Sequence, residues 1–143
     1  MMARIKVLLP DKFSFSTSIP LRITDVNYGG HVGNDSVLSL IQEARMQFLK
    51  EFGFTEMAFG GVSLIMSDAA IEFKNEIFYG DTLIAFVAIM DVNRVGFDIV
   101  YRLIKINNEK EVLAVIAKTG MLCFDYTKKK IVAVPQKVLE LFN

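Results

Sequence analysis

The sequence predicts an α+β fold in which one long helix packs against a curved antiparallel sheet. Residues 37–49 repeat apolar side chains at helical spacing, which predicts the helix. Residues 62–124 hold four long strand-like runs separated by turn signals, which predict the sheet. Because no repeat, low-complexity tract or linker divides the chain, we expect a single domain over residues 1–143.

The first expected strand covers residues 13–19 and continues through residue 23. Phe13, Phe15, Thr17 and Ile19 alternate with serines, a period of two that is typical of a half-buried strand. Residues 25–35 are rich in turn formers and poor in periodic apolar residues, so they predict a loop.

The long helix is expected to begin after this loop, where Asn34, Asp35 or Ser36 can cap its first turn. Gly53 is expected to end it. So broad an apolar surface predicts a helix that is wrapped by the sheet rather than laid on it. The apolar positions are Val37, Leu38, Leu40, Ile41, Ala44, Phe48 and Leu49.

The rest of the chain predicts strands, with a short helix at the C-terminus. The strands are expected at residues 62–74, 82–92, 96–106 and 111–124, as an antiparallel meander of consecutive neighbours. Pro135 can start the last helix, whose docking face would be Val138, Leu139 and Phe142.

Composition narrows the class of protein. A hydrophobic share of 52% excludes global disorder. No apolar run approaches the roughly 18 residues of a membrane span. Sixteen basic residues balance sixteen acidic ones, which argues against a nucleic-acid binder. A mean hydropathy of +0.39 without net charge predicts a further buried surface, and therefore a homo-oligomer, as a dimer or tetramer.

Cysteine usage and the N-terminus predict a cytoplasmic protein. Cys123 is the only cysteine, so it cannot form an internal disulfide, and its apolar neighbours place it in the core. The first residues lack the apolar run of a signal peptide. Five methionines with apolar neighbours are also expected in the core, namely Met46, Met57, Met66, Met90 and Met121.

The loop before the helix concentrates groups that suit hydrolysis. His31, the only histidine, lies near Asp25 and Asn27, and these side chains can transfer protons and orient water. A helix N-terminus offers unpaired amides to a polarised oxygen, and glycines let a ligand approach the backbone. The alternative is a polar turn whose side chains only satisfy backbone amides.

The same residues resemble a known family. Residues 25–35 read Asp-Val-Asn-Tyr-Gly-Gly-His-Val-Gly-Asn-Asp and residues 42–45 read Gln-Glu-Ala-Arg. This pattern, with the Tyr-Gly-Asp turn at residues 79–81, is similar to the hotdog-fold thioesterases of the 4-hydroxybenzoyl-CoA thioesterase type. The resemblance implies a helix wrapped by a five- or six-stranded sheet, dimers that join two sheets, and hydrolysis of acyl-CoA or acyl-carrier-protein thioesters.

One departure from that pattern affects the expected catalytic carboxylate. The second acidic position of the bacterial loop reads Asn27 here, and an amide cannot act as nucleophile or base. The Asp, Asn, His and Glu set is instead similar to plant-type acyl-carrier-protein thioesterases, although two more residues separate Asn27 from His31. The resemblance therefore favours Glu43 as the carboxylate, with Asp25 next.

We expect the catalytic group to comprise Asp25, Asn27, His31 and Glu43. Glu43 lies about 13 Å along an ideal helix axis from the helix start, so a substrate would have to lie along the helix flank. The alternative is a surface carboxylate that pairs with a basic residue. The expected substrate-binding residues are Tyr28, Gly30, Val32, Gly33 and Asn34, with the carbonyl oxygen against the amides of residues 32–34.

Other signals point to no cofactor. One histidine and one cysteine cannot supply a usual zinc shell, and neither a Gly-x-Ser-x-Gly elbow nor a phosphate loop is present. Residues 128–130 are three lysines, which are expected in a solvated turn or against the phosphates of coenzyme A. We therefore expect cofactor-independent thioester hydrolysis. The alternatives are a non-catalytic acyl-thioester-binding or assembly module and a dehydratase of the same fold.

Overall fold

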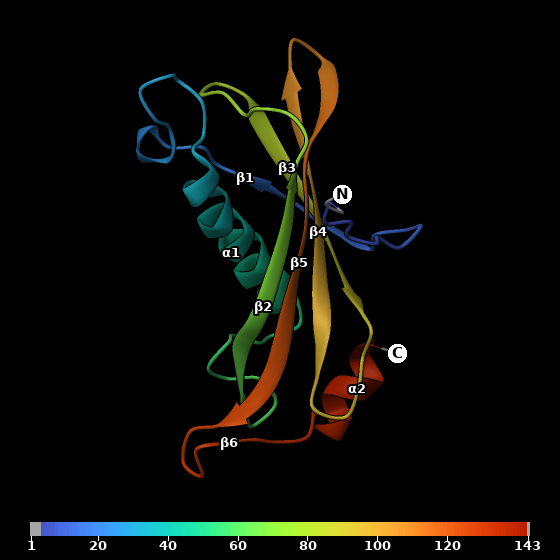
Figure 1. Ribbon diagram of the computed structural model, residues 1–143. Coiled ribbons are helices and arrows are strands. Elements are labelled where there is room, and N and C mark those ends of the chain that lie inside the picture. Colours follow the sequence, from blue (N-terminus) through green and yellow to red (C-terminus); the bar gives the residue numbers. More distant parts are fainter. Residues whose placement is uncertain (1–3, 143) are drawn as a thin grey trace.

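The computed structural model describes residues 4–142, which form one sheet that wraps a long helix. The helix α1 (Asn34–Glu51) runs along one face of a twisted six-stranded antiparallel sheet (Figure 1). This is the α+β hotdog arrangement that the sequence predicts. In chain order the other elements are β1 (Phe15–Ile19), the 3₁₀ helix η1 (Ile23–Asp25), β2 (Ser63–Phe73), β3 (Thr82–Met90), β4 (Gly96–Asn107), β5 (Lys110–Asp125), β6 (Lys130–Ile131) and α2 (Gln136–Phe142).

The order of strands in the sheet corrects the expected meander. The order is β1-β3-β4-β5-β2, with β6 added beside β5. Among the four strands of the expected meander, only β3, β4 and β5 are consecutive neighbours, whereas β2 pairs with β5 from Ser63 opposite Phe124 to Phe73 opposite Val115. Local turn signals cannot reveal this pairing, because the chain crosses from β2, at one edge of the sheet, to β3, which lies beside β1 near the other edge. The strands β1 and β2 are the two edges.

The first expected strand is too long at its C-terminal end. The strand β1 ends at Ile19, and Pro20 follows, which has no N–H to donate to a sheet. Residues 23–25 form η1 instead, because the Asp25 carboxylate accepts a hydrogen bond from the Arg22 backbone N–H at 2.8 Å. The turn back toward α1 therefore begins at this carboxylate.

The helix α1 buries the expected stripe with one exception. Six of the seven apolar positions are buried, but Leu38 is 41% exposed, because it falls at the edge of the buried arc. The N-cap is Gly33, in extended conformation and without a side-chain hydrogen bond, so none of the three expected capping residues takes that position. Gly53 has a φ of +80° and follows the C-cap Phe52, which confirms the expected end.

The C-terminal helix docks as predicted. Val138 is fully buried, and the Phe142 ring lies 5.2 Å from that of Phe52 and 5.7 Å from that of Phe97. This aromatic cluster closes the end of the core opposite the His31 loop. No helix within residues 4–142 has the length and apolarity to cross a membrane.

Cys123 lies in the core, as the sequence predicts, and this gives a chemical expectation. Its side chain is fully buried opposite Leu64, and burial raises the pKa of the thiol to about 11. A rise from 9.0 lowers the thiolate fraction at neutral pH roughly 100-fold. We expect a thiol-specific reagent to label native protein far more slowly than protein in denaturant. Equal labelling rates in the two conditions would contradict this burial.

Candidate active site

The loop between η1 and α1 separates two hollows in the surface. One is a cleft of about 310 Å³ between η1 and the exposed flank of α1, which we call the carboxylate cleft, because Asp25 and Glu43 both line it. The other is a cavity of about 270 Å³ beside the end of β2, which we call the His31 cavity. The structure thus divides the expected catalytic residues between two places.

Asp25 is a buried carboxylate at the wall of the carboxylate cleft. Its residue is 5% exposed, and Oδ2 lies 3.9 Å from Arg22 Nε in addition to accepting the Arg22 N–H. The Asp25 carbonyl accepts the Gly33 N–H at 3.4 Å. Asp25 therefore ties η1 to the N-cap of α1 and sets the width of the cleft.

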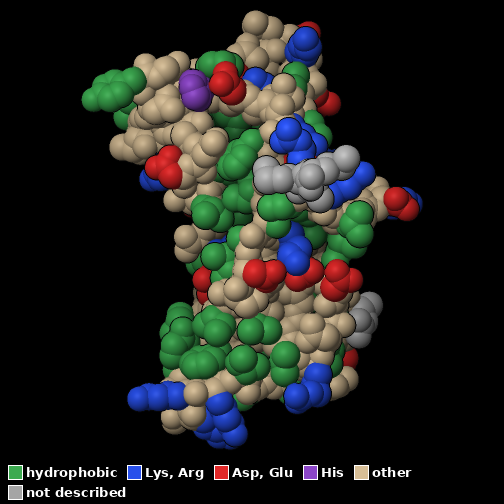
Figure 2. Space-filling view, viewed as in Figure 1, with side chains coloured by type: hydrophobic (Ala, Val, Ile, Leu, Met, Phe, Trp, Pro, Cys, Tyr) green, Lys and Arg blue, Asp and Glu red, His purple; other side chains and the backbone are tan. Residues whose placement is uncertain are grey.

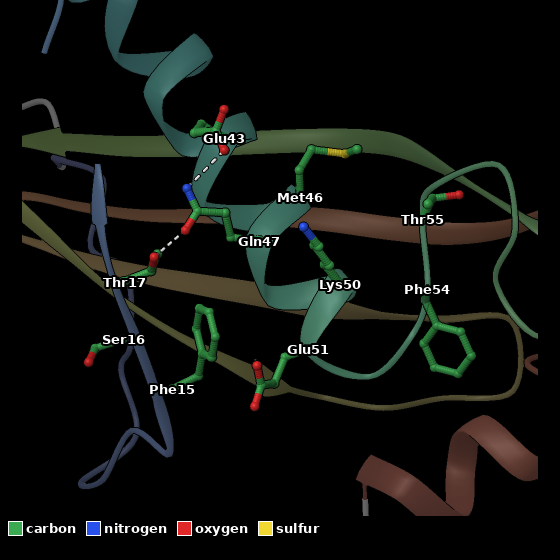
Figure 3. Close-up of a pocket in the computed structure, with 10 residues that line it drawn as sticks. All are labelled: Phe15, Ser16, Thr17, Glu43, Met46, Gln47, Lys50, Glu51, Phe54 and Thr55. Atoms are coloured by element: carbon green, nitrogen blue, oxygen red, sulfur yellow. Dashed lines mark hydrogen bonds between the residues drawn. The ribbon is translucent and has the colours of Figure 1, made fainter. Parts of the chain in front are cut away.

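Glu43 is an exposed carboxylate on the opposite wall. Gln47 Nε2 donates to Glu43 Oε2 at 2.9 Å, and the Thr17 hydroxyl donates to Gln47 Oε1 (Figure 3). This partner differs from the expected one, since no basic residue among the described ones forms a salt bridge with Glu43. Glu43 and Met46 also line a neighbouring groove of about 930 Å³, so the cleft and the groove adjoin at these two side chains of α1.

Arg22, Ser39 and Gln42 line the carboxylate cleft between these two acids. Each offers N–H or O–H donors that could hold a carbonyl oxygen. Apolar walls complete the cleft, and one of them is Met46, which is 37% exposed. Among the methionines expected in the core, Met121 is buried, whereas Met46, Met57 and Met66 are exposed.

The loop itself is held by its own backbone. The Asn27 N–H donates to the His31 carbonyl and the Gly30 N–H to the Asn27 carbonyl, both at 3.0 Å. Gly30 has a φ of +80°, which favours glycine in this turn. A Cβ at Gly29 would lie 3.0 Å from the His31 ring, so a larger residue there would require the ring to shift by a few tenths of an ångström. Tyr28 at the tip is fully exposed.

His31 lies on the far side of the loop from the two carboxylates. Its ring meets the Phe78 ring edge to face, 6.1 Å between centroids, and lines the His31 cavity with Asn34 and Phe73. Asn27 lies in the loop and is not among the residues that line either hollow. Its Oδ1 accepts the Gly29 N–H at 3.0 Å, and its Nδ2 lies 4.0 Å from the position that a Cβ on Gly33 would take.

Two of the amides expected to hold a carbonyl oxygen have other partners. The Val32 N–H donates to the Ile77 carbonyl at 2.7 Å, and the Gly33 N–H donates to the Asp25 carbonyl. The expectation for residues 32–34 is therefore wrong for these two amides, whose bonds build the loop. Asn34 is the first residue of α1, so its N–H has no hydrogen-bond acceptor within the helix.

A buried cation that the sequence patterns did not predict lies two residues after Glu43. Arg45 is 6% exposed; its Nε donates to Glu56 at 2.7 Å and its Nη1 to the Tyr101 hydroxyl at 3.2 Å. That hydroxyl shares a 2.7 Å hydrogen bond with Thr119, and burial raises the pKa of Tyr101 although Arg45 opposes the rise. The available signal was position: Arg45 follows Ala44 within the apolar stripe.

The described part of the chain holds no preformed cluster of metal-binding side chains. Within residues 4–142, no three His, Cys, Asp or Glu side chains gather closely enough to hold a metal ion.

Comparison with known proteins finds thioesterases and an esterase among the similar proteins. A putative esterase of Aquifex aeolicus is 28% identical over 116 residues, which cover 80% of this chain and 86% of the esterase. A 1,4-dihydroxy-2-naphthoyl-CoA thioesterase from Synechocystis superposes with a TM-score of 0.77 at 20% identity, over 90% of this chain and 94% of that one. A 4-hydroxybenzoyl-CoA thioesterase variant, solved with 4-hydroxybenzoyl-CoA, gives 0.80 at 14% identity, over 90% and 98%. Residues 21–142 match the thioesterase-like superfamily, and the chain belongs to that family.

Proposed function

We propose that this protein hydrolyses acyl-CoA thioesters in the carboxylate cleft. One observation carries the proposal: Asp25 from η1 and Glu43 from α1 line the same cleft, with hydrogen-bond donors between them. Membership of the thioesterase-like superfamily supports the reaction class. The structural neighbours named for aroyl-CoA substrates support a coenzyme A thioester over one on a carrier protein.

The proposed reaction is attack by water on the thioester carbonyl. Glu43 is exposed to solvent, so it can accept a proton from a water that attacks the carbonyl carbon. The carbonyl oxygen gains negative charge, and the Ser39 hydroxyl, the Gln42 amide or Arg22 can donate to it. The carbon–sulfur bond then breaks, and the thiolate leaves and takes up the proton from Glu43. The products are the free acid and the thiol.

We propose that the substrate lies along α1, from the loop toward Phe54. The acyl group would follow the groove that continues from Glu43 and Met46, while the thiol arm would turn toward the His31 cavity. In this placement Asp25 holds the loop wall of the cleft. Asn27 holds the loop by accepting the Gly29 N–H, and its amide, which cannot take a proton at neutral pH, would act on the carbonyl or a water only by hydrogen bonding.

A panel of acyl-CoA substrates, assayed by release of free thiol, tests the proposal. Turnover on any member supports a thioesterase. Binding without turnover would instead support an acyl-thioester-binding module, and hydration of an enoyl-CoA would support a dehydratase. The panel should include aromatic and straight-chain acyl groups, because the groove carries both apolar and polar walls.

His31→Ala is expected to lower kcat/KM by about 10- to 100-fold on the best substrate, because the ring lines the cavity proposed for the thiol arm. The fold should remain, since the bond from Asn27 uses the backbone carbonyl of His31. Steady-state kinetics with a thermal melt of the same sample measures both. A wild-type kcat/KM would remove the His31 cavity from the substrate path.

We propose that the protein is a homodimer that pairs through β2. This strand is an edge of the sheet, and residues 66–69 of it are exposed in succession. Hydrophobic side chains are exposed on the same side of the molecule, over the lower part of β2 and β5 (Figure 2). An edge strand with apolar neighbours is a ready surface for a second copy.

Sedimentation at micromolar concentration should give a dimer. Met66→Lys, at a position 48% exposed on β2, is expected to shift the protein toward monomer. Met57→Lys is the matched control, because Met57 is 67% exposed but lies outside β2. A monomeric wild-type protein would contradict the proposal.

We also infer a cytoplasmic location, since the buried Cys123 is the only cysteine and has no disulfide partner in the chain.

A further inference from the structure

A short chain of hydrogen bonds connects the sheet to Glu43. Thr17 lies on β1, where it pairs with Ala85 of β3, and its hydroxyl donates to Gln47 Oε1. Gln47 lies one turn after Glu43 on α1, and its Nε2 donates to Glu43 Oε2 at 2.9 Å. Figure 3 shows the three side chains, which line the groove, joined by these two hydrogen bonds.

The direction of this chain is fixed by its members. A carboxylate only accepts hydrogen bonds, so the Gln47 amide must present its NH₂ end to Glu43. Its oxygen then points to β1, where the Thr17 hydroxyl donates to it. Reversing the amide would place oxygen against carboxylate oxygen. Glu43 therefore selects the orientation of the amide, the Thr17 hydroxyl restrains the amide in that orientation, and the amide holds one carboxylate oxygen of Glu43.

We infer that Gln47 is a positioning residue for Glu43, and that Thr17 locks Gln47 in its working orientation. The inference rests on the proposed function, because it concerns the group that takes the proton from water. Holding Oε2 restricts rotation of a carboxylate that lines the carboxylate cleft. An exposed glutamate without this restraint would sample several rotamers, few of which face the attacking water.

The alternative is that the bond between Gln47 and Glu43 only supports the helix, as pairs four residues apart commonly do. That role would change stability but not the chemical step. The two roles differ in kinetics: a positioning residue affects kcat only while Glu43 is present, whereas a helix-supporting residue affects each variant alike. A double-mutant cycle separates them.

The experiment measures kcat and KM of Gln47→Leu, Thr17→Val, Glu43→Gln and the double variant Gln47→Leu with Glu43→Gln. We expect Gln47→Leu to lower kcat about 10- to 100-fold with little change in KM. Thr17→Val keeps the shape of the side chain and should lower kcat by a smaller factor. The double variant should be no slower than Glu43→Gln alone. Gln136→Leu, at an exposed position on α2, is the matched control and should keep the wild-type kcat.

A wild-type kcat in Gln47→Leu would overturn the inference while leaving thioester hydrolysis in place. So would a double variant whose loss is the product of the two single losses. A wild-type protein with no turnover on the acyl-CoA panel would instead overturn the proposed function itself, and the inference with it. Thermal melts of all variants show whether a lost kcat reflects a lost fold.

Discussion

Glu43→Gln is expected to lower kcat for acyl-CoA hydrolysis by about 10²- to 10⁴-fold, the usual cost of losing a general base. The amide keeps the size of the side chain and can still contact Gln47, but it cannot take a proton from water. Because Glu43 is exposed, the melting temperature should change little. Steady-state kinetics on the best substrate of the panel, with a thermal melt, measures both quantities.

Two variants serve as controls for that result. Glu140→Gln alters an exposed carboxylate on α2, away from the cleft and the groove, and it should keep the wild-type kcat. Asp25→Asn should cost less than Glu43→Gln, since the amide oxygen can still accept the Arg22 N–H that holds η1. Asn27→Asp should keep or raise activity. A wild-type kcat in Glu43→Gln would end its role as base, and a larger loss in Asp25→Asn would transfer that role to Asp25.

Arg45→Met is expected to lower the free energy of unfolding by about 3 kcal/mol. Methionine fills most of the buried space but leaves the Glu56 carboxylate, whose side chain is 25% exposed, without its partner. The Tyr101 hydroxyl loses its bond from Arg45 but keeps its bond to Thr119. Denaturant unfolding followed by circular dichroism measures the change.

The control for this prediction is an ion pair whose cation is exposed. Lys74 lies 3.0 Å from Glu72, and its side chain is 42% exposed, so Lys74→Met should change stability by less than about 1 kcal/mol. Adding Glu56→Gln to Arg45→Met should recover part of the loss, because it removes the unpaired charge. Equal effects of Arg45→Met and Lys74→Met would show that the Arg45 network does not stabilise the fold.

Local patterns predicted most of the elements but not how they meet. The helix α1 and strands β2 to β5 lie within a few residues of their expected bounds, because periodicity and turn residues are local signals. The pairing of β2 with β5 depends on contacts between distant segments, which no local signal contains. The 3₁₀ turn after β1 depends on the bond between the Asp25 carboxylate and the Arg22 N–H, and this bond forms only when the chain turns.

The candidate site shows the same division. The motif in residues 25–45 identified the residues, but only the fold shows that Asp25 and Glu43 share a cleft while His31 lines a different cavity. Gln47 could not be assigned from the sequence, since its role depends on Thr17 of another element. Arg45 is buried because Tyr101 and Glu56 meet it from far along the chain, whereas arginine alone suggests a surface position.

The central claim is that the thioester is cleaved between Asp25 and Glu43, and a crystal structure of the Glu43→Gln variant with a slowly hydrolysed acyl-CoA tests it most directly. The account predicts the carbonyl carbon in the carboxylate cleft, the acyl group in the groove beside Met46 and the thiol arm toward His31. An acyl-CoA whose carbonyl lies outside this cleft, without contact to residue 25 or residue 43, would contradict it.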